Sequence, residues 1–469
     1  MNKFFEALVN VFRIPDLRRR VLFTLALLAV YRIGAYIPTP GIDTHRFEEF
    51  FNRSANGGGF LSYFDFFSGG NVRRMTVFAL GITPYITASI ILQLLTVVVP
   101  TLEKLQKEGE IGRRKITQWT RYLTVGLALV QSFGIAWALK GAEGNFVVNP
   151  SIGFVLLTML TFTTGTAFIM WLGEQITERG IGNGMSLIIF TGIVCGLPNA
   201  ATQLYTRVFV TRDWSALQLL ILLAVMVAVV AFIVLVERGE RRIPVQYAKR
   251  VVGRRMMGGQ QTHLPLKVNA GGVIPVIFAS SLLALPQTAL QLPFVRNSTW
   301  LSGMLSAMGM GTVLYYLLFV ALIVFFCFFY VSIIFNPNEA ADNMRKYGGF
   351  IPGIRPGRNT ADYMDKILSK ITVVGGLYLS ILAIIPTIMI SGIKLQRLPL
   401  IGNFIDAHFP RFLLDGLGIQ FFFGGTSLLI VVGVAMDTVN QVEAQLIMRH
   451  YDGFTPRAGR IRGRRSSSA

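Results

Sequence analysis

Apolar runs long enough to cross a bilayer constrain this chain more than any other feature. A helix rises about 1.5 Å per residue, so roughly 20 apolar residues span the hydrocarbon core. Only 14% of the residues are charged, against about 25% in soluble globular domains. The chain is therefore predicted to be an all-α polytopic membrane protein. Ten runs are predicted to span, at about 21–38, 77–99, 118–138, 152–173, 185–205, 215–236, 269–290, 312–335, 369–391 and 417–440.

The distribution of basic residues predicts the orientation of these spans. With the N-terminus inside, the two termini and the even-numbered connections hold 30 of the 44 Lys and Arg residues, and the odd-numbered connections hold 11. Because basic residues are retained on the cytoplasmic side, both termini are predicted to be cytoplasmic. The first apolar run follows Arg18-Arg19-Arg20 without a small-residue cleavage site, which indicates an uncleaved first span.

A short motif occurs once in each half of the chain. It reads GITPYITAS at Gly81–Ser89 and GVIPVIFAS at Gly272–Ser280, and each copy opens the second span of its half. The halves are predicted as 1–205, with spans 1–5, and 206–452, with spans 6–10. Because five is odd, the second half starts from the opposite membrane face and the repeat is inverted. Gly/Pro-interrupted segments in corresponding positions indicate the working site of such proteins; the other interpretation is coincidence in a chain rich in Gly, Ala and Ile.

The repeated segments have a side-chain pattern that suits a closable opening. Proline is tolerated in the first turn of a helix, so Pro84 and Pro275 are predicted to begin helices. Aliphatic residues followed by small or polar ones then recur at helical spacing, as Ile82, Ile86, Ser89 and Gln93 and as Val273, Ile277, Ser280 and Ala284. Aliphatic side chains can form a dewetting constriction, and small residues allow close but separable helix contacts. Ordinary helix packing produces the same spacing.

One aromatic segment is too short to cross the membrane. Residues 60–67 read FLSYFDFF, with Gly57-Gly58-Gly59 before them and Gly69-Gly70 after them. Glycines at both ends supply backbone freedom, which is typical of a short re-entrant or mobile helix. An interfacial helix lying on the membrane surface would have the same composition.

Motifs for covalent or metal chemistry are not found, so neither catalysis, a cofactor nor a metal is expected. The sequence Gly424-Gly425-Thr426-Ser427 lacks the lysine of a phosphate-binding loop. Cys195 and Cys327 lie in separate spans and are interpreted as packing residues. Among ionisable residues only Arg32 lies well inside a span, whereas ion-coupled pumps usually need more. A passive conduit is favoured, with an inverted-repeat secondary transporter of small solutes as the alternative.

Long strings along the chain resemble the SecY family, the central subunits of bacterial protein-conducting channels. They are GITPYITASIILQLLT at 81–96, KEGEIGRRK at 107–115, GEQITERGIGNGMS at 173–186, VERGERRI at 236–243, THLPLKV at 262–268, FIPGIRPG at 350–357 and FGGTSLLIVV at 423–432. The resemblance implies two inverted five-helix halves around a central pore, with a short re-entrant plug helix. It further implies translocation of unfolded secretory polypeptides and lateral release of hydrophobic segments into lipid.

The resemblance also implies roles for particular residues. The aliphatic pore ring matches Ile82, Ile86, Ile189, Ile277 and Ile430. The plug matches the segment near 60–74, including Phe60, Leu61, Phe64, Phe67 and Arg74. The lateral gate lies between spans 2 and 3 on one side and spans 7 and 8 on the other. Candidate polar residues along that seam are Ser89, Gln93, Gln131, Asn269 and Ser280.

Two connections, 237–268 and 336–368, resemble the docking surface for the ribosome and for the SecA motor ATPase. Their candidate docking residues are Arg238, Arg241, Arg242, Lys249, Arg250, Arg254, Arg255 and Arg355. A basic loop gains affinity for ribosomal RNA by counterion release, although basic loops also fix membrane orientation.

The remaining expectations concern partners and location. SecE and SecG subunits, signal peptides and nascent secretory or membrane proteins are expected by family resemblance. The basic tail 453–469 is expected to be disordered, and it could contact anionic lipid. The resemblance implies the bacterial plasma membrane.

Overall fold

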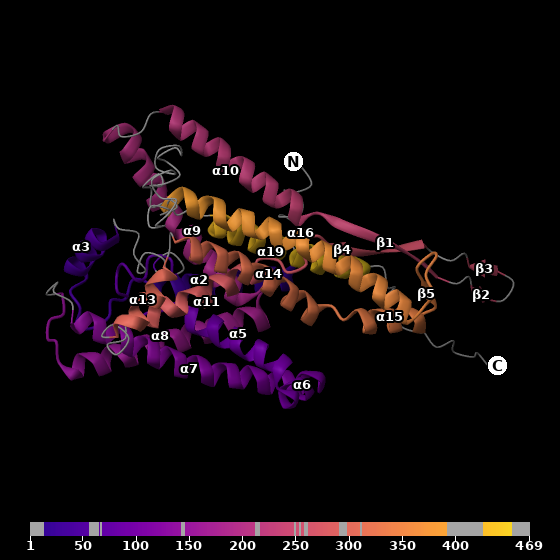
Figure 1. The fold of residues 1–469 in the computed structure, drawn as a ribbon, viewed down its shortest axis with the longest axis horizontal. Coiled ribbons are helices and arrows are strands. Elements are labelled where there is room, and N and C mark those ends of the chain that lie inside the picture. The colour runs from indigo at the N-terminus through magenta and orange to yellow at the C-terminus, as the bar shows by residue number, and fades with distance from the viewer. Residues whose placement is uncertain are drawn as a thin grey trace, which may run out of the picture.

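The fold is taken from a computed structural model (Figure 1). It describes residues 14–55, 65, 68–141, 146–211, 216–247, 250–252, 255–257, 261–289, 298–309, 312–391 and 425–452. A helix coincides with each predicted span: α2 Pro15–Gly34, α5 Thr83–Val98, α7 Glu110–Lys140, α8 Ile152–Arg179, α9 Gly184–Tyr205, α10 Ala216–Glu237, α11 Ile274–Ala289, α14 Val313–Ile334, α16 Arg358–Ser391 and α19 Gly425–Asp452. Shorter helical segments are α3 Thr44–Ala55, α6 Pro100–Lys107, η1 Thr206–Val210, α13 Thr299–Ala307 and α15 Pro337–Lys346.

The apolar helices make this a multi-pass membrane protein. Within the described part of the chain, six helices are long and apolar enough to cross a membrane. The count becomes seven if α5 and α6, which meet at a bend of 104°, form one span. Two further apolar helices, Leu222–Glu237 and Ile274–Leu283, are shorter. Length and composition therefore support most of the predicted spans, while the full count of ten stays a prediction.

Both copies of the repeated motif adopt the same backbone conformation. Gly81 has φ +57° and Gly272 has φ +58°. A 16-residue helix begins two residues after each glycine, and its second residue is Pro84 in α5 and Pro275 in α11. The prediction that these prolines begin helices is confirmed. The predicted starts at 77 and 269 were too early, because the residues before each motif form turns that place the glycine in the left-handed region.

Short strands join the two connections predicted as docking loops. Strands β1 Glu240–Tyr247, β4 Gln261–Lys267 and β5 Gly349–Phe350 form an antiparallel sheet in the order β4-β1-β5. A separate pair consists of β2 Arg250–Val252 and β3 Arg255–Met257. Because β5 follows α15, its pairing with β1 brings the second connection against the first. We call the end of the bundle that carries this sheet the sheet end (Figure 1).

The sheet is absent from an all-α prediction because its strands are short and only partly apolar. Along β1, Ile243 and Val245 are buried while Arg241 and Arg242 are exposed, which is the alternation of a half-buried strand. Ile243 packs in a small core with Leu266 of β4 and with side chains from α14 and α16. The sheet is thereby anchored to the helices.

The largest core lies where the two halves meet. Its buried side chains come from α2, α5, α8 and α9 in the first half and from α10, α11, α14, α16 and α19 in the second. The repeated helices α5 and α11 both contribute to it and contact each other. The two motif copies are therefore neighbours in space, as an inverted pair at the centre of the bundle requires.

The left-handed glycine of the second motif can be tested by substitution. We expect Gly272→Ala to lower the stability of the protein by about 1 kcal/mol, because an L-residue in this conformation costs ~1–2 kcal/mol. No atom lies within 4 Å of the added Cβ, so backbone strain is the only cost. The measurement is the midpoint of thermal unfolding in detergent, monitored through the reaction of a thiol-reactive dye with Cys195 and Cys327.

Gly126→Ala is the matched control. Gly126 is an exposed glycine within α7, with open space around its Cβ position, and alanine is the better helix former by about 1 kcal/mol. The thermal unfolding midpoint of this variant should stay unchanged or rise. Equal falls for both variants would contradict the conformational account.

Candidate functional site

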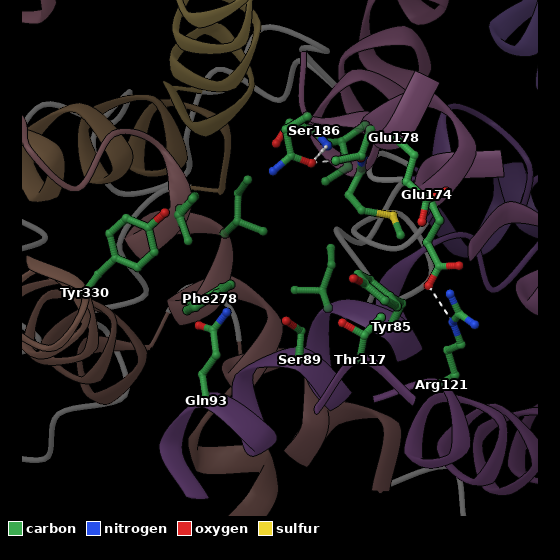
Figure 2. A pocket seen from close by; sticks show the side chains of 17 residues that line it. Tyr85, Ser89, Gln93, Thr117, Arg121, Glu174, Glu178, Ser186, Phe278 and Tyr330 are labelled. Atoms are coloured by element: carbon green, nitrogen blue, oxygen red, sulfur yellow. Dashed lines mark hydrogen bonds and ion pairs between the residues drawn. The ribbon is translucent and has the colours of Figure 1, made fainter. Parts of the chain in front are cut away.

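A cavity of about 420 Å³ lies between the two halves, on the sheet-end side of the central core. Helices α5, α7, α8 and α9 line it from the first half, and α11 and α14 line it from the second (Figure 2). Its lining residues are Tyr85, Ile86, Ser89, Gln93, Thr117, Arg121, Glu174, Thr177, Glu178, Asn183, Met185, Ser186, Ile189, Ile274, Ile277, Phe278 and Tyr330.

The predicted pore-ring residues lie together. Three of them, Ile86, Ile189 and Ile277, line the cavity. Ile82 and Ile430 belong to the same buried cluster, and none of the five side chains is more than 7% exposed. They come from α5, α9, α11 and α19 and from the residue before α5, and so from both halves. This shared burial places aliphatic side chains where the halves close on each other.

Of the five predicted gate residues, Ser89 and Gln93 line the same cavity. Ser89 and Gln93 are on the cavity-facing side of α5 (Figure 2). Ser280 is buried in α11, where its hydroxyl donates to the Ile277 carbonyl at 2.9 Å. The side-chain carbonyl oxygens of Gln93 and Gln131 are buried without a hydrogen-bond partner among the described residues. An unpaired buried acceptor costs about 1–3 kcal/mol, so both amides would gain from a polar neighbour.

Asn269 is placed differently from the other gate candidates. It lies in the turn before α11, not on the helix face, and it is 5% exposed. Its side-chain amide donates to Glu237 Oε2 at 3.0 Å and to the Gly272 carbonyl at 3.1 Å. It lines a second cavity, of about 250 Å³, together with Glu237 and residues of α19. Asn269 therefore belongs to the joint between the sheet and α11.

An ion pair that was not predicted from the sequence lies on the rim of the first cavity. Arg121 Nε of α7 lies 2.8 Å from Glu174 Oε1 of α8 (Figure 2). No local sequence pattern pairs these residues, because they are 53 positions apart. The Arg121 side chain is 44% exposed, so this pair orients the rim and adds little stability.

The apolar residues of the predicted plug lie outside the described residues, namely Phe60, Leu61, Phe64 and Phe67. The segment that follows them is fastened to α2. Tyr31 donates its hydroxyl to the Ser68 carbonyl at 3.3 Å, and Arg32 donates to the Gly69 carbonyl at 3.4 Å. Arg32, the one predicted charge deep in a span, therefore has a backbone partner in this segment.

Further interactions hold the same segment to its surroundings. Arg74 places its guanidinium 4.8 Å from the centroid of the Tyr36 ring, a cation–π contact. A Cβ on Gly69 would lie 2.6 Å from the Gly192 Cα of α9, so two glycines permit this close approach. The segment after the predicted plug residues thus packs between α2 and α9.

Asp65 is a buried carboxylate within the predicted plug segment near 60–74. It is 6% exposed, and its Oδ1 accepts from the Arg73 backbone N–H at 2.7 Å. Burial raises the pKa of Asp65 to about 6, and this outweighs the opposing effects of the hydrogen bond and charge of Arg73. Sequence reasoning passed over Asp65 because it is one polar residue in an aromatic run.

The structure describes some of the predicted docking residues in full and others only in part. Arg238, Arg241, Arg242 and Arg355 are exposed at the sheet end. Arg250 and Arg255 lie in β2 and β3, with only their backbone described, and Lys249 and Arg254 lie outside the described residues. Because β1 pairs with β5, the chain segments that carry Arg241 and Arg355 belong to one unit. Among the described residues, no group of three His, Cys, Asp or Glu side chains could hold a metal ion.

The raised pKa of Asp65 predicts pH-dependent stability of residues 68–76. A carboxyl whose pKa in the folded protein exceeds its ordinary value favours the fold when protonated, so this stabilisation is complete below about pH 4 and is lost as the pH rises through about 6. A pKa difference of about two corresponds to about 3 kcal/mol. We expect Asp65→Asn to protect these amides at pH 7 and to remove the dependence. Amide hydrogen exchange between pH 4.5 and 7.5 measures this. The Asp65→Asn variant serves as the reference for the pH dependence of intrinsic exchange, which both proteins share. Parallel pH profiles for the two proteins would refute the assignment.

Comparisons with known proteins agree with this architecture. The SecY family model matches residues 76–439. The SecY protein translocase subunit of Streptomyces galbus is 47% identical over 457 residues, covering 96% of this chain and 99% of the relative. The subunit of Escherichia coli strain K12 is 46% identical over 446 residues, covering 94% and 95%.

Solved structures share the fold. One described as a protein conducting channel superposes with a TM-score of 0.60 at 17% identity, covering 93% of this chain and 94% of that one. Sec61 in the canine ribosome-channel complex gives a TM-score of 0.56 at 17% identity, covering 93% and 94%. The family match, the near-complete relatives and this fold together show that the chain belongs to the SecY family of protein translocase channel subunits.

Proposed function

We propose that this chain forms a protein-conducting channel that translocates unfolded secretory polypeptides between its two halves and releases hydrophobic segments sideways into lipid. The observation that carries the proposal is the cavity between the halves, whose lining includes Ile86, Ile189 and Ile277 from both halves. Membership of the SecY family supports the same function. The solute-transporter alternative is not favoured, since the relatives are translocase subunits.

The aliphatic lining answers the physical problem of such a channel. A polypeptide about 10 Å wide as a helix must pass without a leak of ions. Aliphatic side chains have no fixed hydrogen-bond pattern, so they can close around chains of any sequence, and they exclude water from a narrow empty pore. We propose that Ile82, Ile86, Ile189, Ile277 and Ile430 form this seal.

Lateral release would use the contact between α5 and α11. The hydrophobic effect favours movement of an apolar segment from the aqueous cavity into lipid once this seam opens. Ser89 and Gln93 line the cavity beside the seam, and the unpaired Gln93 carbonyl could accept from the backbone or side chain of a passing chain. On this proposal the segment near 60–74 is the plug, held by residues 68–74 against α2 and α9.

The partners are proposed from the relatives and from the sheet end. The similar solved channels include ribosome complexes of canine Sec61 and yeast Ssh1, and the exposed arginines of the sheet end would contact ribosomal RNA or the SecA motor. SecE and SecG subunits and anionic lipids complete the proposed assembly. The sheet end and both termini would face the cytoplasm of a bacterium, in its plasma membrane, and the chain itself would catalyse no covalent step.

The seal can be tested by placing an amide in it. We expect Ile86→Asn and Ile277→Asn each to raise ion leak about tenfold and to allow transport of precursors with weak signal sequences, because a buried unpaired amide costs about 1–3 kcal/mol in the closed state. The measurement is ion flux and precursor uptake in proteoliposomes. Ile188→Asn is the control, since Ile188 is also buried, in α9, but does not line the cavity. Unchanged leak in both test variants would leave no support for the seal.

Charge reversal tests the docking surface. We expect Arg255→Glu with Arg355→Glu to weaken ribosome binding and to make the salt slope shallower by about one for each phosphate that is no longer neutralised. Co-sedimentation of ribosomes with proteoliposomes across a salt series measures this. Lys140→Glu, at the other end of α7 from Glu110, is the control. Weaker binding with an unchanged salt slope would rule out direct contact with RNA.

A further inference from the structure

The sheet is inserted between α10 and the gate helix α11 with almost no spacer. Helix α10 ends at Glu237 and β1 begins at Glu240, while β4 ends at Lys267 and α11 begins at Ile274. The base of the hairpin is closed by pairing of Glu240 with Lys267 and by a hydrogen bond from the Val268 N–H to the Gly239 carbonyl at 2.9 Å. Six residues therefore connect the end of β4 to the start of α11, and two connect α10 to β1.

One buried amide bridges the three elements at this joint. The Asn269 side-chain nitrogen donates to Glu237 Oε2, on the last residue of α10, at 3.0 Å. It also donates to the Gly272 carbonyl, in the turn that starts α11, at 3.1 Å. Asn269 is 5% exposed and Glu237 is 8% exposed. A hydrogen bond to a carboxylate in a buried site is among the stronger single contacts in a protein, because little water competes for either partner.

Packing keeps the base of the sheet stiff. A Cβ on Gly375 of α16 would lie 2.9 Å from the Val268 carbonyl, so α16 packs directly on the residue before Asn269. Ile243 and Leu266 anchor the strands on the other side of the base. The sheet and its base therefore form one packed unit with the end of α10 and with the first half and the middle of α16.

Gly272, three residues after Asn269, is the next part of this connection. Its φ of +58° is open to glycine, and nothing lies within 4 Å of its Cβ position. Val273 follows directly and is buried against Gly433 of α19, and Ile277 lies one helical turn later in the cavity lining. The packed base and the Asn269 amide thus hold Gly272, and α11, which carries the proposed seal residue Ile277, begins two residues later.

We infer that Asn269 and Glu237 are positioning residues that couple the docking sheet to the gate helix, so that a partner bound at the sheet end shifts α11 through the Asn269 bridge. This inference rests on the proposed function. Lys267, Asp437 and Tyr330 line the adjoining cavity, so they set the local field that acts on the bridge.

The experiment compares two changes at Glu237 in the complete translocase reconstituted in proteoliposomes. Glu237→Gln retains an oxygen that can accept from Asn269, whereas Glu237→Ala removes the acceptor. Three quantities are measured for each: SecA affinity, ion leak without SecA, and the rate of ATP-driven precursor uptake per bound SecA. We expect Glu237→Ala to lower uptake per bound SecA at least fivefold, roughly the lower end of ordinary coupling effects, with affinity and leak unchanged. Glu237→Gln should stay within about twofold of the unaltered protein, since its acceptor is kept.

A reversed bond provides a second test. Asn269→Asp places two carboxylates together and should lower uptake per bound SecA like Glu237→Ala. Adding Glu237→Gln restores a donor between the two positions, now from 237 to 269, but not the bond to the Gly272 carbonyl, so it should recover part of the loss. Equal rates for Glu237→Ala and Glu237→Gln, or no recovery in the double variant, would overturn the coupling. If the unaltered protein neither binds SecA nor transports, the proposed function fails instead, so the two failures are distinguishable.

Discussion

Backbone hydrogen bonding in lipid is the constraint on which this structure depends. The hydrocarbon core offers no partner for a free N–H or C=O, so the chain crosses it as helices. An opening for another polypeptide can then form only between helices, never within one. The cavity with α5, α7, α8 and α9 on one side and α11 and α14 on the other does lie between helices, next to the packed aliphatic core.

Two kinds of surface, one aliphatic and one polar, lie between the two halves. Aliphatic side chains such as Ile86 and Ile277 meet where the halves close, and they can part without breaking hydrogen bonds. Polar groups such as the Arg121–Glu174 pair lie on the rim of the cavity, where the Arg121 side chain is exposed. The proposed seal would need the first surface in order to open for many sequences, and the proposed entrance would need the second to admit a hydrated chain.

The sheet end shows how irregular structure can be rigid. Its strands are short and its arginines exposed, yet β1 is held by β4, by β5 and by a small core with α14 and α16. The bridge from Asn269 to Glu237 continues this rigidity to the start of α11. The two connections that are separate in sequence thus act as one body beside the repeated helix.

The sequence alone determined the helical membrane class, the place of each apolar run and the matching positions of the two Gly-Pro motifs, because span length and glycine conformation are local properties. It also selected the five pore-ring isoleucines, through family resemblance. Only the tertiary structure decided that Asn269 joins the sheet to α11, that Arg121 pairs with Glu174, and that Asp65 is buried with a raised pKa. These facts depend on groups brought together from distant positions, and no local pattern records which buried polar atom will find which partner.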